Sequence, residues 1–367
     1  HLAVVNSKAI EILGLGESVF HDYNRGLIVE DNVHKVAEMF VEKFGIEPNE
    51  RALHEFIRMG VVAVCDMNFS ANLSVRFIEK LSRMMEIYYY KTIKDLDAMG
   101  IPDISNVLKR YKASGCGLKL FMDGSIGART AYLYEPYKDD PSNRGILLIQ
   151  EELLEEIIRI ADSLRIQVAI HAIGEAAIDT ALNALKNTDP SLRHRIEHFE
   201  MPHEDHIDRL ARLRIIPSMQ PNFIANWQMK GGLYEHRLGW DRARRMNPLK
   251  SILDACGLIS FGSDCMPIGP FYGIYGALTH PLEHERLEFC EAVQCYTYGS
   301  AYSIFCEDRL GKMKEGYEAS FIVCNVTLNA LTPQSIRDVN PICVYRRGAR
   351  IYWDKSSHHN SPCISQV

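Results

Sequence analysis

Short apolar runs of strand length alternate with segments of helical spacing through most of this 367-residue chain. The pattern predicts helices at residues 151–164, 175–186, 204–213 and 242–255. It predicts strands at residues 61–67, 86–93, 117–123, 167–173, 195–200, 215–220 and 258–264. Alternating strands and helices form a parallel sheet, and eight such units close into a (β/α)8 barrel, also called a TIM barrel. Seven units are visible, so we expect an α/β barrel that is one unit short.

The two ends of the chain differ from this middle part. Residues 1–58 form a helical segment, with helices expected at 7–13, 32–44 and 48–59, and residues 59–305 would form the barrel. Beyond residue 305 the sequence becomes rich in turns, and 319–325 and 342–353 have the pattern of short strands. We therefore expect 306–354 to belong to a small β-domain beside the barrel and 355–367 to be a flexible tail.

Composition and charge narrow the classes of function. The chain is 47% hydrophobic and 24% charged, which is ordinary for a globular protein. Its net charge of -6 provides no basic face for nucleic acid, and no apolar run reaches the ~18 residues of a membrane span. The 10 cysteines are scattered singly, without a Cys-x-x-Cys pair, which is typical of a protein of the reducing cytoplasm.

Lys119 lies in an otherwise apolar strand, where a buried ammonium is costly unless it is paired or chemically altered. Strand alternation turns Leu118 and Leu120 toward the helices and Lys119 toward the barrel lumen. Lys119 is either half of a structural ion pair, with Asp66 or Asp123 as the partner, or part of a reactive site. This residue alone does not decide between the two.

Three further side chains of metal-binding type fall at the ends of predicted strands: His171, His198 and Asp264. Each alone is more typical of a structural residue. In a parallel barrel, however, the carboxyl ends of the strands meet at one face, where the chemistry of such barrels takes place. With Lys119 they form a nitrogen and oxygen ligand set suited to Zn²⁺ or a similar divalent ion. A metal there would activate a water, and Asp264 would take its proton and pass it to a leaving amine.

Motifs of rival chemistries are absent from the sequence. It contains no Gly-x-Ser-x-Gly of a hydrolase nucleophile, no Gly-x-x-x-x-Gly-Lys-Ser/Thr and no Gly-x-Gly-x-x-Gly. Nucleophilic serine catalysis of that type and phosphate binding by a glycine-rich loop are therefore not indicated.

Five ordered stretches of sequence resemble successive motifs of the metal-dependent amidohydrolase superfamily, and the nearest group is amidohydrolase-3, which includes enzymes similar to N-substituted formamide deformylase. The five are "LKLFMDGSIGARTAYLYEPY" from residue 118, "IHAIGEAAIDTAL" from 170, "RHRIEHFEMPHEDHIDRLARLRIIPSMQPNF" from 193, "GSDCMPIGPF" from 262 and "LGKMKEGYEASFIV" from 310. The resemblance covers nearly the whole chain. It implies a (β/α)8 barrel with a small flanking β-sandwich, one or two divalent ions with Zn²⁺ expected, and hydrolysis of an amide-type C–N bond other than a peptide bond.

The resemblance also implies roles for the same four residues. Lys119 would be carboxylated on its amine and bridge two metals, while His171 and His198 would bind the second metal. Asp264 would be both a ligand and the general acid and base. Asp123, Arg129 and Gln220 are the candidates for contact with the substrate, which would be a small amide-like molecule. A homodimer is the candidate assembly.

The chain also departs from the family pattern. The family's first strand carries His-x-His, and this sequence contains no such pair. Gly174-Glu175 stands where Gly-Asp is usual, and residue 1 matches a point well inside the family's length. We therefore expect the C-terminal two-thirds of a longer protein, with the first strand missing. The alternatives are a deaminase of a cyclic amidine, or a non-catalytic binding or regulatory relative without the first metal site.

Overall fold

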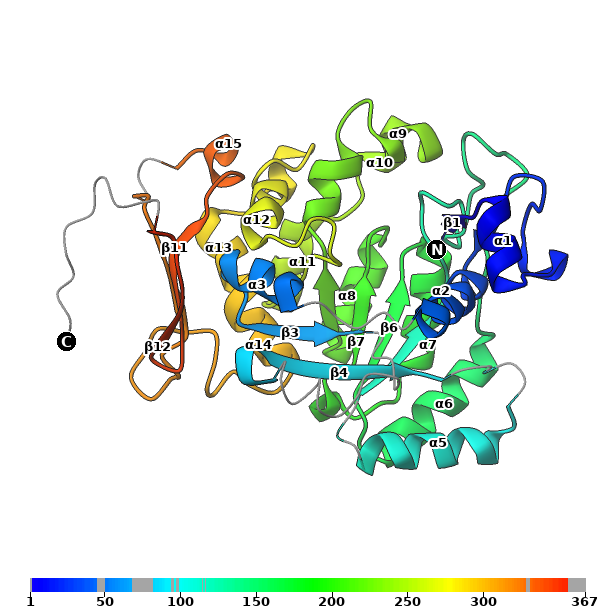
Figure 1. The fold of residues 1–367 in the computed structure, drawn as a ribbon, viewed down its shortest axis with the longest axis horizontal. Helices are drawn as coiled ribbons and strands as arrows, with labels where there is room; N and C mark the ends of the chain where they lie inside the picture. Colours follow the sequence, from blue (N-terminus) through cyan, green and yellow to red (C-terminus); the bar gives the residue numbers. More distant parts are fainter. Residues whose placement is uncertain are drawn as a thin grey trace.

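The structure is a computed structural model that describes residues 2–44, 50–67, 82–93, 96, 99–113, 115, 117–327 and 331–355. The first elements of the chain, β1 (Leu2–Val4), α1 (Ser7–Leu13) and α2 (Asp31–Phe44), and a small C-terminal sheet lie toward opposite ends of its long axis, with the main sheet and its helices between them (Figure 1). The last part of the predicted tail, residues 356–367, lies outside the described residues. A helix that crosses a membrane needs a long apolar run, and none of the helices in the described part has one.

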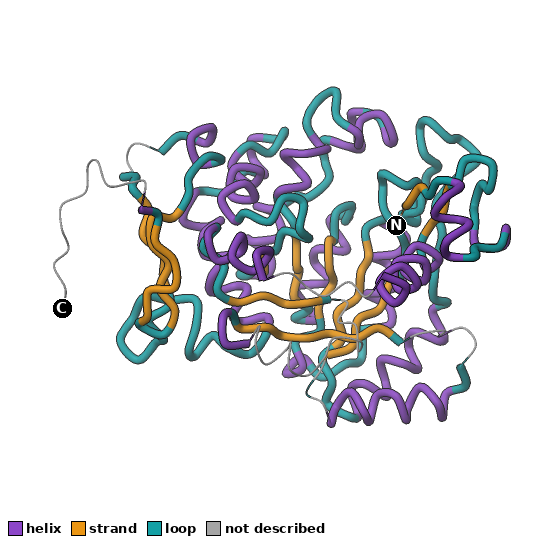
Figure 2. Tube along the Cα trace, viewed as in Figure 1, coloured by secondary structure: helices purple, strands orange, loops and turns teal. Residues whose placement is uncertain are grey.

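The main sheet contains seven strands in the described residues, in the order β3-β4-β5-β6-β7-β8-β9. All neighbours are parallel. The strands turn progressively along the sheet, so that β3 and β4 cross the direction of β7 and β8 (Figures 1 and 2). The sheet is thus a curled half-barrel of the expected class. Its strands are β3 (Ala63–Asp66), β4 (Glu86–Thr92), β5 (Gly117–Phe121), β6 (Val168–Ala172), β7 (Arg195–His198), β8 (Ile216–Met219) and β9 (Ser260–Phe261).

Every predicted strand of the barrel is present. The run at 258–264 gives the least regular structure: β9 ends at Phe261, and Asp264 lies beyond it in a turn. The helices around the sheet are α5 (Ile101–Ala113), α6 (Glu151–Ser163), α7 (Glu175–Ala184), α8 (Glu204–Leu213), α11 (Leu249–Cys256), α12 (Pro270–Leu278), α13 (Phe289–Gln294) and α14 (Ser300–Ser303). Short 3-10 or π turns lie between them at η3 (Pro190–Leu192), η5 (Glu283–Glu285) and η6 (Cys295–Gly299).

The main core lies between the sheet and these helices. Leu118 and Leu120 of β5 pack into it with Ile104 of α5 and Ile157 of α6. These contacts use the face of β5 that alternation predicts, which turns Lys119 to the opposite, inner face. The fully buried strand β6 contributes Val168 and its neighbours to the same core.

A second, smaller core lies beyond the carboxyl ends of the strands. It joins the long loop after β5 to the segment after β8, which contains η4 (Ile224–Gln228), α9 (Leu233–Leu238) and α10 (Trp240–Ala243). Tyr137 and Tyr234 are buried there. The single helix predicted at 242–255 is wrong: α10 ends at Ala243 and α11 begins at Leu249. Pro248 explains the interruption, because proline lacks the N–H that a continuous helix needs.

The N-terminal segment contains the predicted helices as α1 (Ser7–Leu13), α2 (Asp31–Phe44) and α3 (Glu50–Arg58), with the short turn η1 (Glu17–Val19). It also contains an antiparallel pair that the sequence analysis missed, β1 (Leu2–Val4) and β2 (Leu27–Val29). These strands are three residues long and pair across a gap in sequence, so local alternation carried too little signal.

The C-terminal part forms a three-stranded antiparallel sheet in the described residues: β10 (Phe321–Cys324), β11 (Pro341–Arg346) and β12 (Ala349–Trp353), with the short helix α15 (Pro333–Ile336) between β10 and β11. The two predicted strand regions are confirmed, and the second divides into a hairpin at Arg347-Gly348. Val344 packs with Ile57 of α3 and Met85 in a separate apolar cluster, which attaches this sheet to the barrel.

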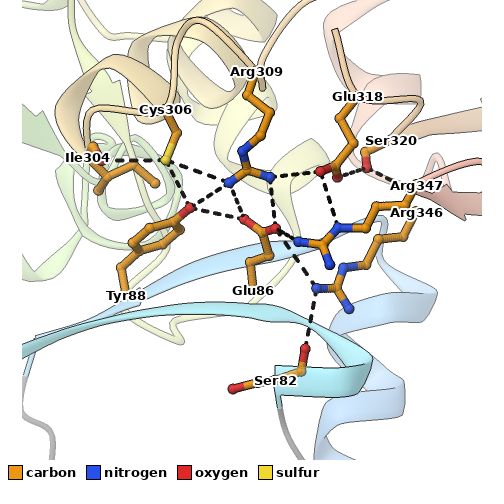
Figure 3. A network of polar contacts seen from close by, with 10 residues as sticks. All are labelled: Ser82, Glu86, Tyr88, Ile304, Cys306, Arg309, Glu318, Ser320, Arg346 and Arg347. Carbon is orange, nitrogen blue, oxygen red and sulfur yellow. Dashed lines mark hydrogen bonds and ion pairs between the residues drawn. The ribbon is translucent and has the colours of Figure 1, made fainter. Parts of the chain in front are cut away.

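A polar network strengthens the same junction (Figure 3). Glu86, the first residue of β4, accepts two hydrogen bonds of 2.8 Å from Arg309 and one from Arg347. Glu318 accepts from the same two arginines at 2.7 and 3.2 Å. The hydrogen bonds from Arg309 above all lower the pKa of Glu86 to about 2. Charge pairing and apolar contact therefore both fix the small sheet to the start of β4.

Candidate functional site

Lys119 is buried on the inner face of β5, with 3% of its surface exposed. Burial lowers the pKa of its amine to about 8, while attraction to Glu197 and then Asp264 opposes that shift. Asp123 also attracts this amine, but less than Glu197 and Asp264 do. At neutral pH a measurable fraction of the amine is therefore unprotonated.

His171 and His198 lie on neighbouring strands at their carboxyl ends, where Ala172 pairs with His198 in register. Their ring centroids are 4.5 Å apart in an edge-on arrangement, and both side chains are buried. The Nε2 of His171 lies 2.9 Å from the carbonyl oxygen of Gly124 and 3.4 Å from Asp123 Oδ1. A neutral His171 that donates from Nε2 keeps its lone pair on Nδ1. The two imidazoles predicted to act together are thus side by side.

Asp123 fixes the loop after β5 to the end of β6. Its carboxylate accepts hydrogen bonds from the backbone N–H of Tyr132, Ile173 and Gly174, at 2.9, 3.1 and 2.9 Å. The approach at Gly174 is so close that a Cβ there would lie 2.0 Å from the carbonyl oxygen of Tyr132. Asp123 thus has a positioning role here, and its contact with a substrate stays a prediction.

Asp264 lies in the turn after β9, where it is exposed, and its charge attracts the buried amine of Lys119. Asp264 and Cys265 have φ angles of 48° and 59°, and His198 has 73°. Non-glycine residues adopt these left-handed conformations uncommonly, although Asp and His do so more often than most. His198 at the end of β7 and Asp264 after β9 therefore share a left-handed backbone conformation.

The donor chemistry of this site suits a divalent ion. A metal-binding histidine usually donates its second ring N–H to a carbonyl or carboxylate, which is how Gly124 and Asp123 surround His171. Within the part of the chain that the structure describes, no three His, Cys, Asp or Glu side chains are already arranged as a metal cage. The residues therefore fit a divalent ion by the chemistry of their donor atoms.

The other two candidates for substrate contact lie apart from each other. Arg129 makes a two-point ion pair with Asp139 at 3.0 and 2.9 Å in the loop after β5. Gln220 is buried directly after β8, where its Nε2 donates to the Ser218 carbonyl at 3.3 Å. The side chain of Arg129 is thus held by an ion pair within its own loop, whereas Gln220 lies at the carboxyl edge of the sheet, which also carries the two histidines.

Two sets of residues near the site were missed from the sequence. Arg195 and Glu197 form a buried ion pair on the inner face, at 2.8 and 3.1 Å, and their spacing of two residues in a strand was the available signal. Asn222 and Phe223 contact the Asp264 turn and His198. For these two, only their position directly after a strand could have drawn notice.

Comparison with known proteins agrees with this geometry. The sequence model of the Amidohydrolase family matches residues 1–352. The protein named "Putative amidohydrolase YtcJ" of Bacillus subtilis is 36% identical over 236 residues, which cover 60% of this chain and 44% of that protein. The N-substituted formamide deformylase of Arthrobacter pascens is 22% identical over 280 residues, covering 72% and 50%. The chain thus spans about half the length of these curated relatives.

Among solved structures, an uncharacterized metal-dependent hydrolase from Pyrococcus furiosus superposes with a TM-score of 0.68 at 30% identity. The superposition covers 87% of this chain and 69% of that one. The predicted resemblance is confirmed, as is the predicted fold class of a barrel-like parallel sheet with small antiparallel sheets beside it. By sequence along nearly its whole length and by fold, the chain belongs to the amidohydrolase family.

Proposed function

We propose that this protein is a hydrolase that cleaves an amide-type C–N bond, other than a peptide bond, in a small molecule and depends on a divalent metal. The observation that supports the proposal is that His171 and His198 lie side by side at the carboxyl ends of β6 and β7, with Lys119 buried on the neighbouring strand β5. His171 and His198 have rings in contact, and Lys119 and Asp264 attract each other. Zn²⁺ is the proposed metal, because it favours a nitrogen and oxygen ligand set of this kind.

In this proposal His171 and His198 hold the metal, with Lys119 and Asp264 completing the ligand set. When bound there, a divalent ion lowers the pKa of water and polarises a carbonyl oxygen. The contribution of His171 is orientation: its Nε2 is fixed at 2.9 Å from the Gly124 carbonyl, which sets the ring for coordination through Nδ1.

Lys119 is proposed to react with carbon dioxide. The neutral amine forms an N–C bond to CO₂ and releases one proton, which gives a carbamate. The lowered pKa supports this step, because it supplies neutral amine near physiological pH. The product is an anion whose two oxygens can bind cations, so burial would no longer oppose an isolated ammonium.

Asp264 is proposed to move the proton. Its carboxylate takes a proton from the attacking water at Oδ and delivers it to the nitrogen of the leaving amine, which makes that amine a better leaving group. The turn that carries Asp264 has a left-handed backbone, which directs this residue away from the normal path of the strand.

The test begins with the full-length protein, dialysed without chelator, and its metal content by plasma mass spectrometry. Hydrolysis is followed as formate release from an N-substituted formamide, the class that the Arthrobacter pascens relative is named for. We expect bound Zn²⁺, formate release, and an added mass on the peptide that contains Lys119 equal to that of one CO₂.

Asp264→Asn should retain the fold and lose about 10² to 10⁴-fold in rate. The matched control is Asp254→Asn, on the exposed surface of α11, which should retain the rate. Ammonia release from a cyclic amidine without formate release would replace the proposal by a deaminase. A metal-free protein without either activity would reject a catalytic role.

A further inference from the structure

Asn222 and Phe223, directly after β8, lie between two residues of the proposed site, and this placement suggests a role that the family resemblance does not assign. We propose that Asn222 and Phe223 act as a brace that fixes His198 and Asp264 relative to each other. The inference rests on the proposed function only for the purpose of the brace, which is to set the spacing of two metal ligands. The contacts that form the brace are present in the structure whether or not the proposed function is correct.

The amide of Asn222 holds the turn that carries Asp264. Its Nδ2 donates to the carbonyl oxygens of Ser263 and Met266, at 2.8 and 2.5 Å, and these two residues enclose Asp264. Asn222 is fully buried. Both neighbours of the nitrogen are carbonyl acceptors, so the reverse orientation of the amide would place oxygen against oxygen. The amide is therefore set in one orientation by the turn that it holds.

Phe223 contacts His198 from the other side of the brace. The two rings are nearly parallel, with an angle of 13° between planes and 5.9 Å between centroids, an offset stacking arrangement. Phe223 is itself packed against Trp227, at 4.7 Å, which belongs to the second core. The stacked ring limits the rotation of the imidazole at the end of β7.

A brace is needed because the two ligands come from strands that are not adjacent. β7 and β9 each pair with β8 and not with each other in the described sheet. The chain that leaves β8 therefore passes between the ends of both neighbours. His198 and Asp264 also have left-handed backbones, which the surrounding structure must hold in place.

Asn226 makes one of the same contacts as Asn222, the hydrogen bond to the Met266 carbonyl. Its Nδ2 donates to the Met266 carbonyl at 2.7 Å, and its Oδ1 accepts from Tyr272 at 2.8 Å. It is an outer support for the same turn, but it holds one carbonyl rather than both. Asn226→Ala should consequently have a smaller effect than Asn222→Ala.

The first experiment measures the dissociation constant of Zn²⁺ for the full-length protein by competition with a chelating dye. Asn222→Ala and Phe223→Leu should each raise it by about tenfold, the usual result when the support of a metal ligand is removed. In parallel, amide hydrogen exchange in metal-free protein should accelerate by about tenfold in residues 263–266 for Asn222→Ala, because local opening becomes easier. Exchange at Phe199 should accelerate for Phe223→Leu.

Gln167 provides the matched control. Its Nε2 also donates to two backbone carbonyls, those of Arg193 at 2.6 Å and Ser303 at 2.9 Å, but at the opposite end of the sheet. Gln167→Ala removes the same kind of contact, and should lower thermal stability by a similar amount. It should leave the Zn²⁺ constant and the exchange of residues 263–266 unchanged.

The outcomes separate the brace from the proposed function. If the wild-type protein binds no Zn²⁺, the proposed function fails, while faster exchange at 263–266 in Asn222→Ala alone still supports the brace. If Asn222→Ala and Gln167→Ala change Zn²⁺ affinity equally, or if exchange at 263–266 is unchanged, the brace is rejected and Asn222 is an ordinary structural residue.

Discussion

Two buried cations share the inner face of the sheet, and their surroundings affect them in opposite ways. Arg195 donates to both oxygens of Glu197 and to Ser218 at 2.7 Å. Burial alone would lower its pKa, but attraction to Glu197 above all raises it. Lys119 is equally buried, but the attraction of Glu197 and Asp264 does not offset burial, and its pKa falls. A buried charge with a matched partner is costly to leave unpaired, whereas one with incomplete compensation is available for chemistry.

The largest expected effect comes from removing the partner of Arg195. Glu197→Gln leaves a buried guanidinium opposite a neutral amide, so we expect the free energy of unfolding to fall by about 3 kcal/mol. Urea unfolding followed by circular dichroism measures this. Glu307→Gln is the control, because Glu307 makes a similar two-point pair with Arg193 at 3.0 and 2.6 Å that is more exposed. Its cost should be about 1 kcal/mol. Equal losses would contradict the importance of burial.

Removing the other cation should have the reverse consequence. Lys119→Met deletes an incompletely compensated amine, so the free energy of unfolding of the metal-free protein should stay the same or rise. The Zn²⁺ dissociation constant should rise by about 100-fold, because the variant loses a ligand. Equilibrium unfolding and metal competition measure the two quantities. A large loss of stability without a change in Zn²⁺ affinity would make Lys119 a structural residue like Arg195.

The junction with the small sheet is an intermediate case, because Glu86 is partly buried and has several cationic partners. Glu86→Gln should lower the free energy of unfolding at pH 7 by about 2 kcal/mol. The pKa of Glu86 is about 2 in the folded protein and 4.5 for the free side chain, so this stability is complete above pH 4.5 and is lost as pH falls toward 2. Unfolding experiments from pH 7 to pH 3 test it: a difference between wild type and variant that does not shrink in acid would refute the pairing.

The smallest effect concerns the titration of Lys119. Its pKa is about 8 in the folded protein and 10.5 for the free side chain, so between these values the unfolded chain holds more protons. The stability of the metal-free wild type, relative to Lys119→Met, should therefore increase by about 1 kcal/mol from pH 8 to pH 9. Thermal or urea unfolding of both proteins at pH 8 and pH 9 measures this difference in stability. A constant difference would mean that the amine is not desolvated in the metal-free protein.

Much of the fold was predictable because burial on a sheet leaves a strong local signal. All seven barrel strands, the lumen side of Lys119 and the adjacency of His171 and His198 follow from apolar runs and alternation. The two failures have identifiable causes. A proline divides the helix predicted at 242–255, and the pairing of β1 with β2 joins distant three-residue strands.

The supporting residues of the site were less accessible to prediction. Asn222 and Phe223 act through contacts with a turn and a ring from other strands, which no spacing within their own segment encodes. The partner of Arg195 was likewise evident only from the structure, although the interval of two residues to Glu197 was visible. Ligand types can be recognised one residue at a time, whereas the groups that orient them become apparent only when strands are placed side by side.

The carboxylate of Asp123 has a consequence for how the substrate range of such a protein can change. By binding Tyr132, Ile173 and Gly174 together, it makes the loop after β5 and the end of β6 a single mechanical unit. A transplanted loop from a relative would have to reproduce that docking point or displace His171. Exchange of this loop alone is therefore obstructed on this side of the site.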